Sequence, residues 1–159
     1  MAIYLEWNAG EIKGDATQGK HVGWITLGSV QLGVGRGIGS AVGSTQNREA
    51  SEPSVSEVVV TKDLDSSSLM FFQEATTGKE GKPVLIDFCT TDNEGAPYLQ
   101  LKLYNTLISG FSASSGGDRP SESMTLNFTQ IDLNETTGNL QNGAGNPIKV
   151  SYNLATASK

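Results

Sequence analysis

Apolar and polar residues alternate with a period of two through most of this 159-residue chain, and this pattern sets its fold class. A period of two places successive side chains on opposite faces of a β-strand, with one face buried and the other solvated. The pattern predicts strands in AIYLEW, GWITLGSVQLGV, VSEVVVTK, KPVLIDFCT, YLQLKLYNTLISGF, SMTLNFTQIDL and IKVSYNL. The sequence therefore predicts a mainly β protein with antiparallel strands.

The alternation changes phase at two points, which predicts a bulge or bend at the first and a bulge at the second. The first change falls at Gly28 and Ser29, and the second at Gln130 and Ile131. The longest predicted strand places five apolar residues on one face, Leu99, Leu101, Leu103, Leu107 and Phe111.

One segment, DLDSSSLMFFQEATTGK, follows a helical period instead. Asp65 or Ser66 can cap the first turn, and Gly78 can stop the last. At helical spacing the segment carries three residues that would share one face, Leu69, Phe72 and Thr76. These signals predict one short helix over 67–76. The chain is then an antiparallel two-sheet barrel or sandwich with one short flanking helix, in a single domain over 1–159.

Charge and composition disfavour several classes of partner. The formal net charge is −6, and the basic residues are few and scattered, which argues against nucleic acid and anionic membrane surfaces. No segment approaches the ~20 apolar residues of a membrane span. The first residues, MAIYLEWNAGE, lack the basic and apolar regions of a cleaved signal peptide, so we expect assembly in the cytoplasm and any export by another route.

Residues suited to catalysis or to metal binding are scarce. The single histidine, His21, excludes a multi-histidine metal site, and the chain has no nucleophile elbow for a Ser-His-Asp triad. We expect His21 to be solvated or to cap a strand entry. The single cysteine, Cys89, sits in an apolar run and is interpreted as a buried structural thiol rather than a nucleophile. The sequence predicts no catalytic residue, no metal and no cofactor.

Four glycines occupy every second position in LGVGRGIGS, residues 32–40. The spacing fits neither a P-loop nor a dinucleotide-binding turn. Residues 37–53 form the longest stretch without periodicity, and glycine lets a backbone bend or approach another surface closely. We interpret this stretch as a protruding arm, with a merely flexible loop or a ligand loop as the alternatives.

A second segment, SSGGDRPSES, joins two long strands and contains Asp118 and Arg119. One interpretation is a polar hairpin loop. The other is a subunit contact, in which Arg119 pairs with a carboxylate across an interface.

The order of the segments resembles the haemolysin-coregulated protein (Hcp) family of the type VI secretion system. The matching pieces are IKGDATQGKHVGWITL, SVSEVVVTKDLDSSSLMFFQEATTGK and YLQLKLYNTLISGFSASSGGDRPSESMTLNF. The family often has proline where this chain has Ser68, and an aromatic residue soon after SMTLNF that this chain lacks before Tyr152.

The resemblance implies a barrel that closes into hexameric rings, which stack into a hollow tube. A sheath drives such a tube out of the cell with effector proteins in its lumen, and the other partners are the tip spike and the baseplate. In this chain the expected contacts between subunits or rings are Gly37, Gly39, Arg48, Glu49, Asp118 and Arg119. Gln31, which faces away from its apolar neighbours, is the expected lumen residue.

Two other classes of function stay open from the sequence. A monomeric carbohydrate-binding sandwich would need exposed aromatic side chains, and both tryptophans, Trp7 and Trp24, lie in apolar strand contexts. An enzyme is the weakest of the three, because histidines, metal ligands and nucleophile motifs are scarce.

Overall fold

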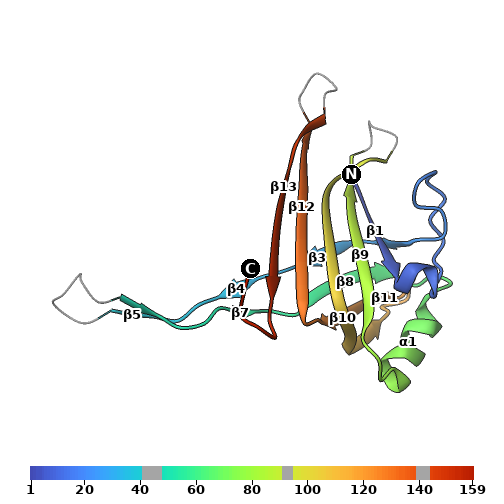
Figure 1. Cartoon of the computed structure of the whole chain (residues 1–159). Coiled ribbons are helices and arrows are strands. Elements are labelled where there is room, and N and C mark those ends of the chain that lie inside the picture. The colour runs from blue at the N-terminus through green and yellow to red at the C-terminus, as the bar shows by residue number, and fades with distance from the viewer. Residues whose placement is uncertain (41–47, 91–94, 139–143) are drawn as a thin grey trace.

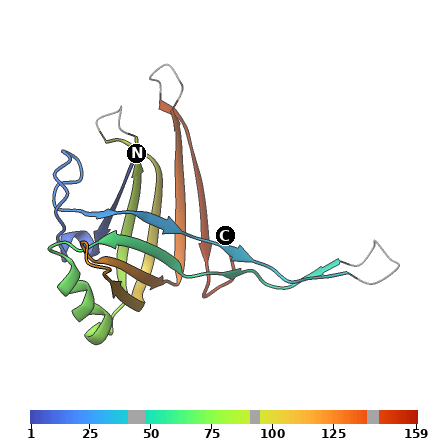
Figure 2. The same cartoon turned by 180° about the vertical axis from the view of Figure 1, so that it is seen from behind.

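The computed structural model describes residues 1–40, 48–90, 95–138 and 144–159, and it forms two antiparallel sheets whose strands run across one another (Figures 1 and 2). The upright sheet has the order β2 (Ile25–Leu27), β1 (Ala2–Trp7), β9 (Lys82–Cys89), β10 (Pro97–Ser114), β12 (Gln130–Gly138) and β13 (Ala144–Asn153). The crossing sheet consists of the second half of β10, β11 (Ser121–Asn127), β8 (Val58–Asp63) and β3 (Ser29–Gln31).

Two corners join the sheets into a barrel. At the first, Gly28 separates β2 from β3, and its N–H donates to the carbonyl of Thr61 at 2.7 Å. The predicted bend at Gly28 is therefore confirmed. At the second corner β10 turns from one sheet into the other at Asn105, whose φ of 52° lies in the left-handed region.

The second predicted bulge, at Gln130, is wrong. β11 ends at Asn127 and β12 begins at Gln130, so the phase change marks a passage between sheets. In the connection Phe128 is buried, and the N–H of Thr129 donates to the carbonyl of Tyr104 at 3.1 Å. A short connection and a bulge both shift parity by one residue, so the pattern alone does not separate them.

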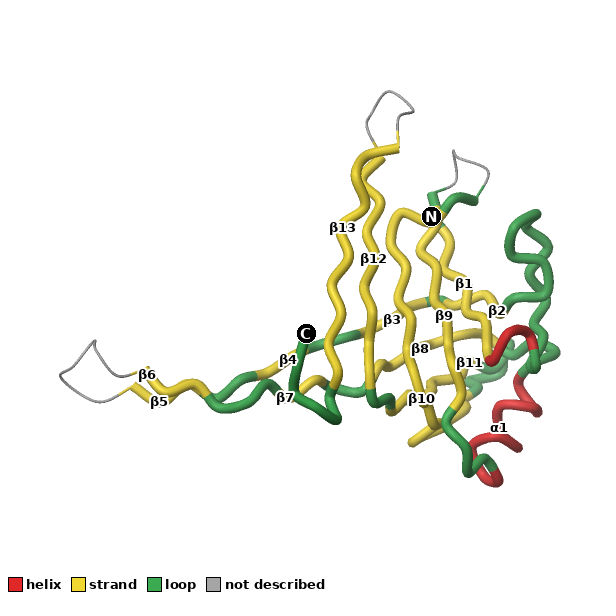
Figure 3. The backbone as a smooth tube through the Cα atoms, viewed as in Figure 1, coloured by secondary structure: helices red, strands yellow, loops and turns green. Residues whose placement is uncertain are grey.

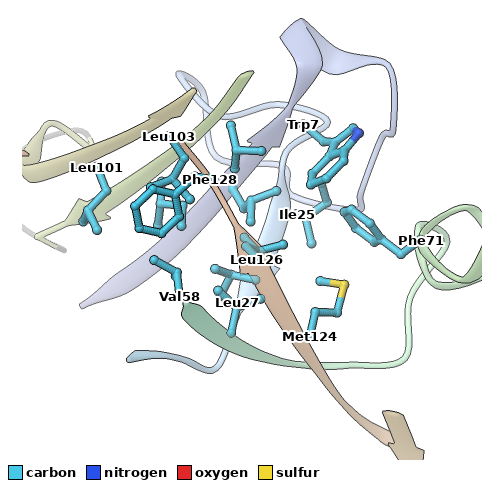
Figure 4. Packing of buried hydrophobic residues seen from close by; sticks show 14 of the residues in the cluster. Trp7, Ile25, Leu27, Val58, Phe71, Leu101, Leu103, Met124, Leu126 and Phe128 are labelled. Carbon is cyan, nitrogen blue, oxygen red and sulfur yellow. The ribbon is translucent and has the colours of Figure 1, made fainter. Parts of the chain in front are cut away.

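The core lies between the two sheets and consists of aliphatic side chains around Trp7, Phe71 and Phe128 (Figure 4). From β10 it takes Leu101 and Leu103. Leu107, expected on the same face, is 38% exposed, because the corner at Asn105 interrupts the alternation of β10.

Helix α1 (Ser68–Thr77) closes one end of the barrel, within one residue of the predicted range. Ser67 is the N-cap residue rather than the predicted Asp65 or Ser66, and the Asp65 carboxylate accepts its N–H at 2.9 Å. The backbone N–H of Gly78 donates to the carbonyl of Glu74 and ends the helix as predicted.

The face of α1 that carries Leu69, Phe72 and Thr76 is not the face that packs on the barrel. The helix buries Ser68 and Phe71, whereas Leu69 is 80% and Phe72 56% exposed. The Phe71 ring packs edge-on against Trp7 with centroids 5.6 Å apart. Ser68 is buried because its hydroxyl hydrogen-bonds the buried Lys62 and Glu122. The apolar residues of the helix alone therefore do not decide which face is buried.

Two features extend beyond the barrel (Figure 3). The pairs β4 (Val34–Gly35) with β7 (Ser54–Val55), and β5 (Ile38–Ser40) with β6 (Arg48–Ala50), continue β3 and β8 as a projecting ribbon. We call this ribbon the arm. A short 3-10 helix, η1 (Asn8–Gly10), directly follows β1. In the upright sheet, β12 and β13 lie beyond β10, which leaves this sheet at its corner, and they form an overhang (Figure 1).

Candidate assembly surfaces

Two serine–glycine pairs hold the strands of the arm together. Ser56 Oγ accepts the Gly33 N–H and donates to the Gly33 carbonyl, both at 2.9 Å. Ser51 Oγ does the same to Gly37, at 2.9 and 3.0 Å. Each serine hydroxyl thus satisfies both backbone polar groups of the glycine opposite it.

These pairs explain two of the four alternating glycines. A Cβ at Gly37 would lie 2.9 Å from Ser51 Oγ, and one at Gly33 would lie 3.3 Å from Ser56 Oγ. A Cβ at Gly35 would have no heavy atom within 4 Å. A side chain at 37 would therefore displace the Ser51 hydroxyl, and one at 33 would crowd the Ser56 hydroxyl. The sequence shows this reason for glycine only when the pairing partners are known.

The predicted contact residues of the arm lie on its two strands. Gly39 pairs with Glu49 and Ser40 with Arg48 through the backbone. Gly37 adjoins this pairing through Ser51. Of the stretch 37–53, expected as an aperiodic loop, residues 41–47 lie outside the described ranges, and its flanks form the strands β5 and β6.

The structure places Asp118 and Arg119 at the opposite end of the crossing sheet from the arm. The arm continues from the start of β8, whereas their turn precedes Ser121, which pairs with Asp63 at the end of β8. Arg119 Nε donates to the Leu64 carbonyl at 2.7 Å, so part of its guanidinium serves its own chain. Gln31 is exposed on the outer face of β3, whereas Val30 packs against the core.

Both outer strands of the upright sheet have one open edge in the described part of the chain. β2 pairs with β1 in this sheet, and β13 pairs with β12. The inner face of β13 also carries apolar side chains that the barrel leaves uncovered, with Ile148 56% and Val150 53% exposed. Edges and apolar faces of this kind need a cover or a neighbour.

An apolar groove of about 460 Å³ lies between the start of the arm and the overhang. We call it the corner groove; its lining is Leu32, Gly33, Val34, Pro53, Val55, Ile131, Leu133 and Tyr152. Val34 at the arm's root is 70% exposed. At the other end of the molecule, Leu69, Met70 and Phe72 form an exposed apolar helix stripe.

His21 lies in a buried polar cluster, so the expectation of a solvated histidine is wrong. Its Nε2 lies 2.9 Å from Asp87 Oδ2, and its Nδ1 lies 2.7 Å from Gln18 Oε1. The ring stacks on Tyr4, with centroids 4.6 Å apart, and meets the edge of Trp24. No local pattern marks this cluster, because Asp87 is 66 positions away in the sequence.

The cluster does not form a nucleophile. In a catalytic triad the nucleophile and the carboxylate contact different nitrogens of the histidine. Here Cys89 Sγ, at 3.8 Å, and Asp87 Oδ2, at 2.9 Å, both face Nε2 of His21. Burial, and next the charge of Asp87, raise the pKa of the Cys89 thiol, which opposes thiolate formation. Across the described ranges, no group of three or more His, Cys, Asp or Glu side chains has the arrangement of a metal site.

Comparisons with known proteins agree with this architecture. The family model described as "Type VI secretion system effector, Hcp" matches residues 4–134. A solved structure described as a type six secretion system protein aligns with TM-score 0.89 at 22% identity, over 99% of this chain and 98% of the other. No curated protein matches.

Two further structures share the fold at low identity. Hcp1 from Salmonella typhimurium aligns with TM-score 0.79 at 18% identity, over 99% of this chain and 97% of the other. The secreted protein Hcp3 from Pseudomonas aeruginosa aligns with TM-score 0.61 at 14% identity, over 96% and 97%. In the described part of the chain, no helix is both long and apolar enough to cross a membrane.

A two-sheet barrel with a covering helix, an arm and open sheet edges defines a class of small β proteins with surfaces suited to association. Within that class, the match over residues 4–134 shows that this chain belongs to the Hcp family of the type VI secretion system.

Proposed function

We propose that this protein is a structural tube subunit of a type VI secretion system and not an enzyme. Six copies close into a ring, the rings stack into a hollow tube, and effector proteins occupy the lumen. The tube assembles in the cytoplasm and is secreted, in contact with the sheath, the baseplate and the tip spike. Family membership supports this proposal.

The observation that carries the proposal is the pair of open edges of the upright sheet. β2 and β13 lie at opposite ends of the strand order, so joining β13 of one copy to β2 of the next gives a head-to-tail interface. Such an interface closes into a ring when its rotation closes, and it covers both open edges of the upright sheet.

The arm and the turn opposite it supply the contacts that the sheet edges do not. In this proposal Gly37, Gly39, Arg48 and Glu49 reach a neighbouring subunit or ring. Asp118 and Arg119 stand at the other end of the crossing sheet and meet a different copy. The prediction that Gln31 lines the lumen requires the outer face of the crossing sheet to face the inside of the ring.

A carbohydrate-binding module finds less support in the structure. Trp7 is fully buried in the core, and Trp24 is half-buried with its ring against His21. Neither tryptophan offers the open platform on which a sugar ring stacks.

Light scattering and negative-stain microscopy of the purified protein test the proposal. We expect a mass near six subunits and ring-shaped particles. A protein that stays monomeric at all practical concentrations would overturn it.

A further inference from the structure

We propose that the helix stripe of one copy docks in the corner groove of the next copy in the ring. The inference rests on the proposed function and specifies which side chains form the second layer of that interface. The occupant of the groove is therefore another molecule of this chain, and the contact is heterologous.

The two surfaces lie at opposite ends of the subunit. The stripe belongs to α1, which is fixed beside β1 through Phe71 and Trp7. The groove lies beside the last two strands of the upright sheet, through Leu133 of β12 and Tyr152 of β13. In the strand order, β1 and β2 form one end and β12 and β13 the other (Figure 1).

Both surfaces lie on the same side of the upright sheet. Phe71 and Trp7 belong to the core, which packs on the inner face of this sheet. Tyr152 stands directly across from the buried Ile131 in the β12–β13 register, so it points toward the same inner face. When the edge of β13 meets the edge of a neighbour's β2, the neighbour's α1 arrives on the side that holds the groove. The docking is thus continuous with the proposed edge contact.

The stripe does not reach the groove of its own chain. The first turn of α1 is tied down inside the barrel, where Ser68 Oγ donates to Glu122 at 2.9 Å and accepts from Lys62 Nζ at 3.0 Å. This tie holds the helix at the end opposite the arm (Figure 2). A second copy can therefore fill the groove, whereas the same copy cannot.

The chemistry of the two surfaces matches. Seven of the eight residues that line the groove have apolar or aromatic side chains, and the eighth is Gly33. The stripe offers Leu69, Met70 and Phe72 without a charged group among them. Removing both surfaces from water favours association by the hydrophobic effect.

Crosslinking of paired cysteines tests the docking directly. The variant Leu69→Cys/Val34→Cys is treated with a short bis-maleimide and run on a denaturing gel. Cys89 is buried, so the wild-type chain serves as the blank. The matched control is Val22→Cys/Val34→Cys, because Val22 is 67% exposed and belongs to neither surface.

We expect a ladder that extends to six subunits for the Leu69→Cys/Val34→Cys variant. We expect at most dimers for the control and for each single-cysteine variant. Rings of six copies without the ladder, or a ladder equally strong in the control, would overturn the docking and leave the tube function standing. A wild-type chain that forms no ring would overturn the tube function itself.

A second measurement uses Leu69→Ser. The Leu69 side chain is 80% exposed in the subunit, whereas Phe72 packs edge-on against Phe111, so only Leu69 is changed and the thermal midpoint stays unchanged while assembly weakens. We expect the concentration at half-assembly to rise about tenfold or more. An unchanged assembly concentration would count against the docking.

Discussion

The ammonium group of Lys62 lies 2.8 Å from a carboxylate oxygen of Glu122, and both side chains are buried in the end of the barrel that α1 covers. The same ammonium lies 2.8 Å from Asp65 and 3.0 Å from Ser68 Oγ. A cation on β8 thereby connects β11 to the first turn of the helix. This network fixes which face of α1 is buried.

Loss of the buried cation is the most disruptive change that we predict. Lys62→Met leaves the Glu122 carboxylate buried without its cation, and we expect the free energy of unfolding to fall by about 3–5 kcal/mol. Urea denaturation at fixed protein concentration measures the loss, with the exposed Lys20→Met as the matched control. The double variant Lys62→Met/Glu122→Leu should regain part of the loss; a single variant as stable as the wild type would refute the role of the network.

Gly37→Ala should loosen the arm without disturbing the barrel. The new methyl group displaces Ser51 Oγ from both backbone groups of residue 37, at a cost of about 0.5–1.5 kcal/mol for each hydrogen bond. We expect protection of the Ser51 amide from hydrogen exchange to fall about tenfold or more. Gly35→Ala, at a position with open space, is the control and should leave protection unchanged.

The pair of Lys82 and Glu11 predicts a specific pH dependence. The Lys82 hydrogen bond, and next that of Asn8, hold the pKa of Glu11 below its ordinary value of 4.5, and the Glu11 hydrogen bond raises the pKa of Lys82. The contribution of Glu11 is therefore complete above pH 4.5 and is lost as the pH falls through the lowered value. Urea unfolding of Glu11→Gln should show a deficit of about 0.2–1 kcal/mol at neutral pH that vanishes in acid. A deficit that grows on acidification would contradict the assignment.

His21→Phe separates the stacking of the ring from its hydrogen bonds. Phenylalanine keeps a ring between Tyr4 and Trp24 but leaves Asp87 without the histidine. We expect a loss of about 1–3 kcal/mol in the free energy of unfolding. Thr17→Ala in the same exposed loop should change stability by less than about 0.5 kcal/mol. An unchanged His21→Phe variant would show that the hydrogen bonds contribute nothing.

The sequence predicts the strands and the helix well, because their periods record which side chains are buried. It does not predict the corner at Asn105, because Leu103 and Leu107 on its two sides keep the same parity in the sequence although their burial differs. It also does not tell which face of α1 is buried, because the exposed face carries Leu69 and Phe72. The rule that apolar means buried fails where a serine is needed by a buried cation.

Of the candidate surfaces, too, the sequence reveals what depends on neighbouring residues and misses what depends on residues far apart in the chain. The glycine pattern draws attention to the arm, but the reason for glycine depends on serines 14 and 23 positions away. The corner groove combines residues from the arm and from the last two strands, so local patterns do not reveal it. The polar cluster of His21 is hidden for the same reason.

The overhang of β12 and β13 has a consequence for how assembly proceeds. In the assembly that we propose, an incomplete ring has two uncovered ends, one with a bare sheet face and one with a bare helix, whereas a closed ring has none. Each added subunit covers one of these interfaces and exposes another of the same kind, and the subunit that closes the ring covers both interfaces at once. In this proposal the closing step is therefore the most favoured one. Open intermediates are then short-lived, and a ring stops adding subunits once it has closed.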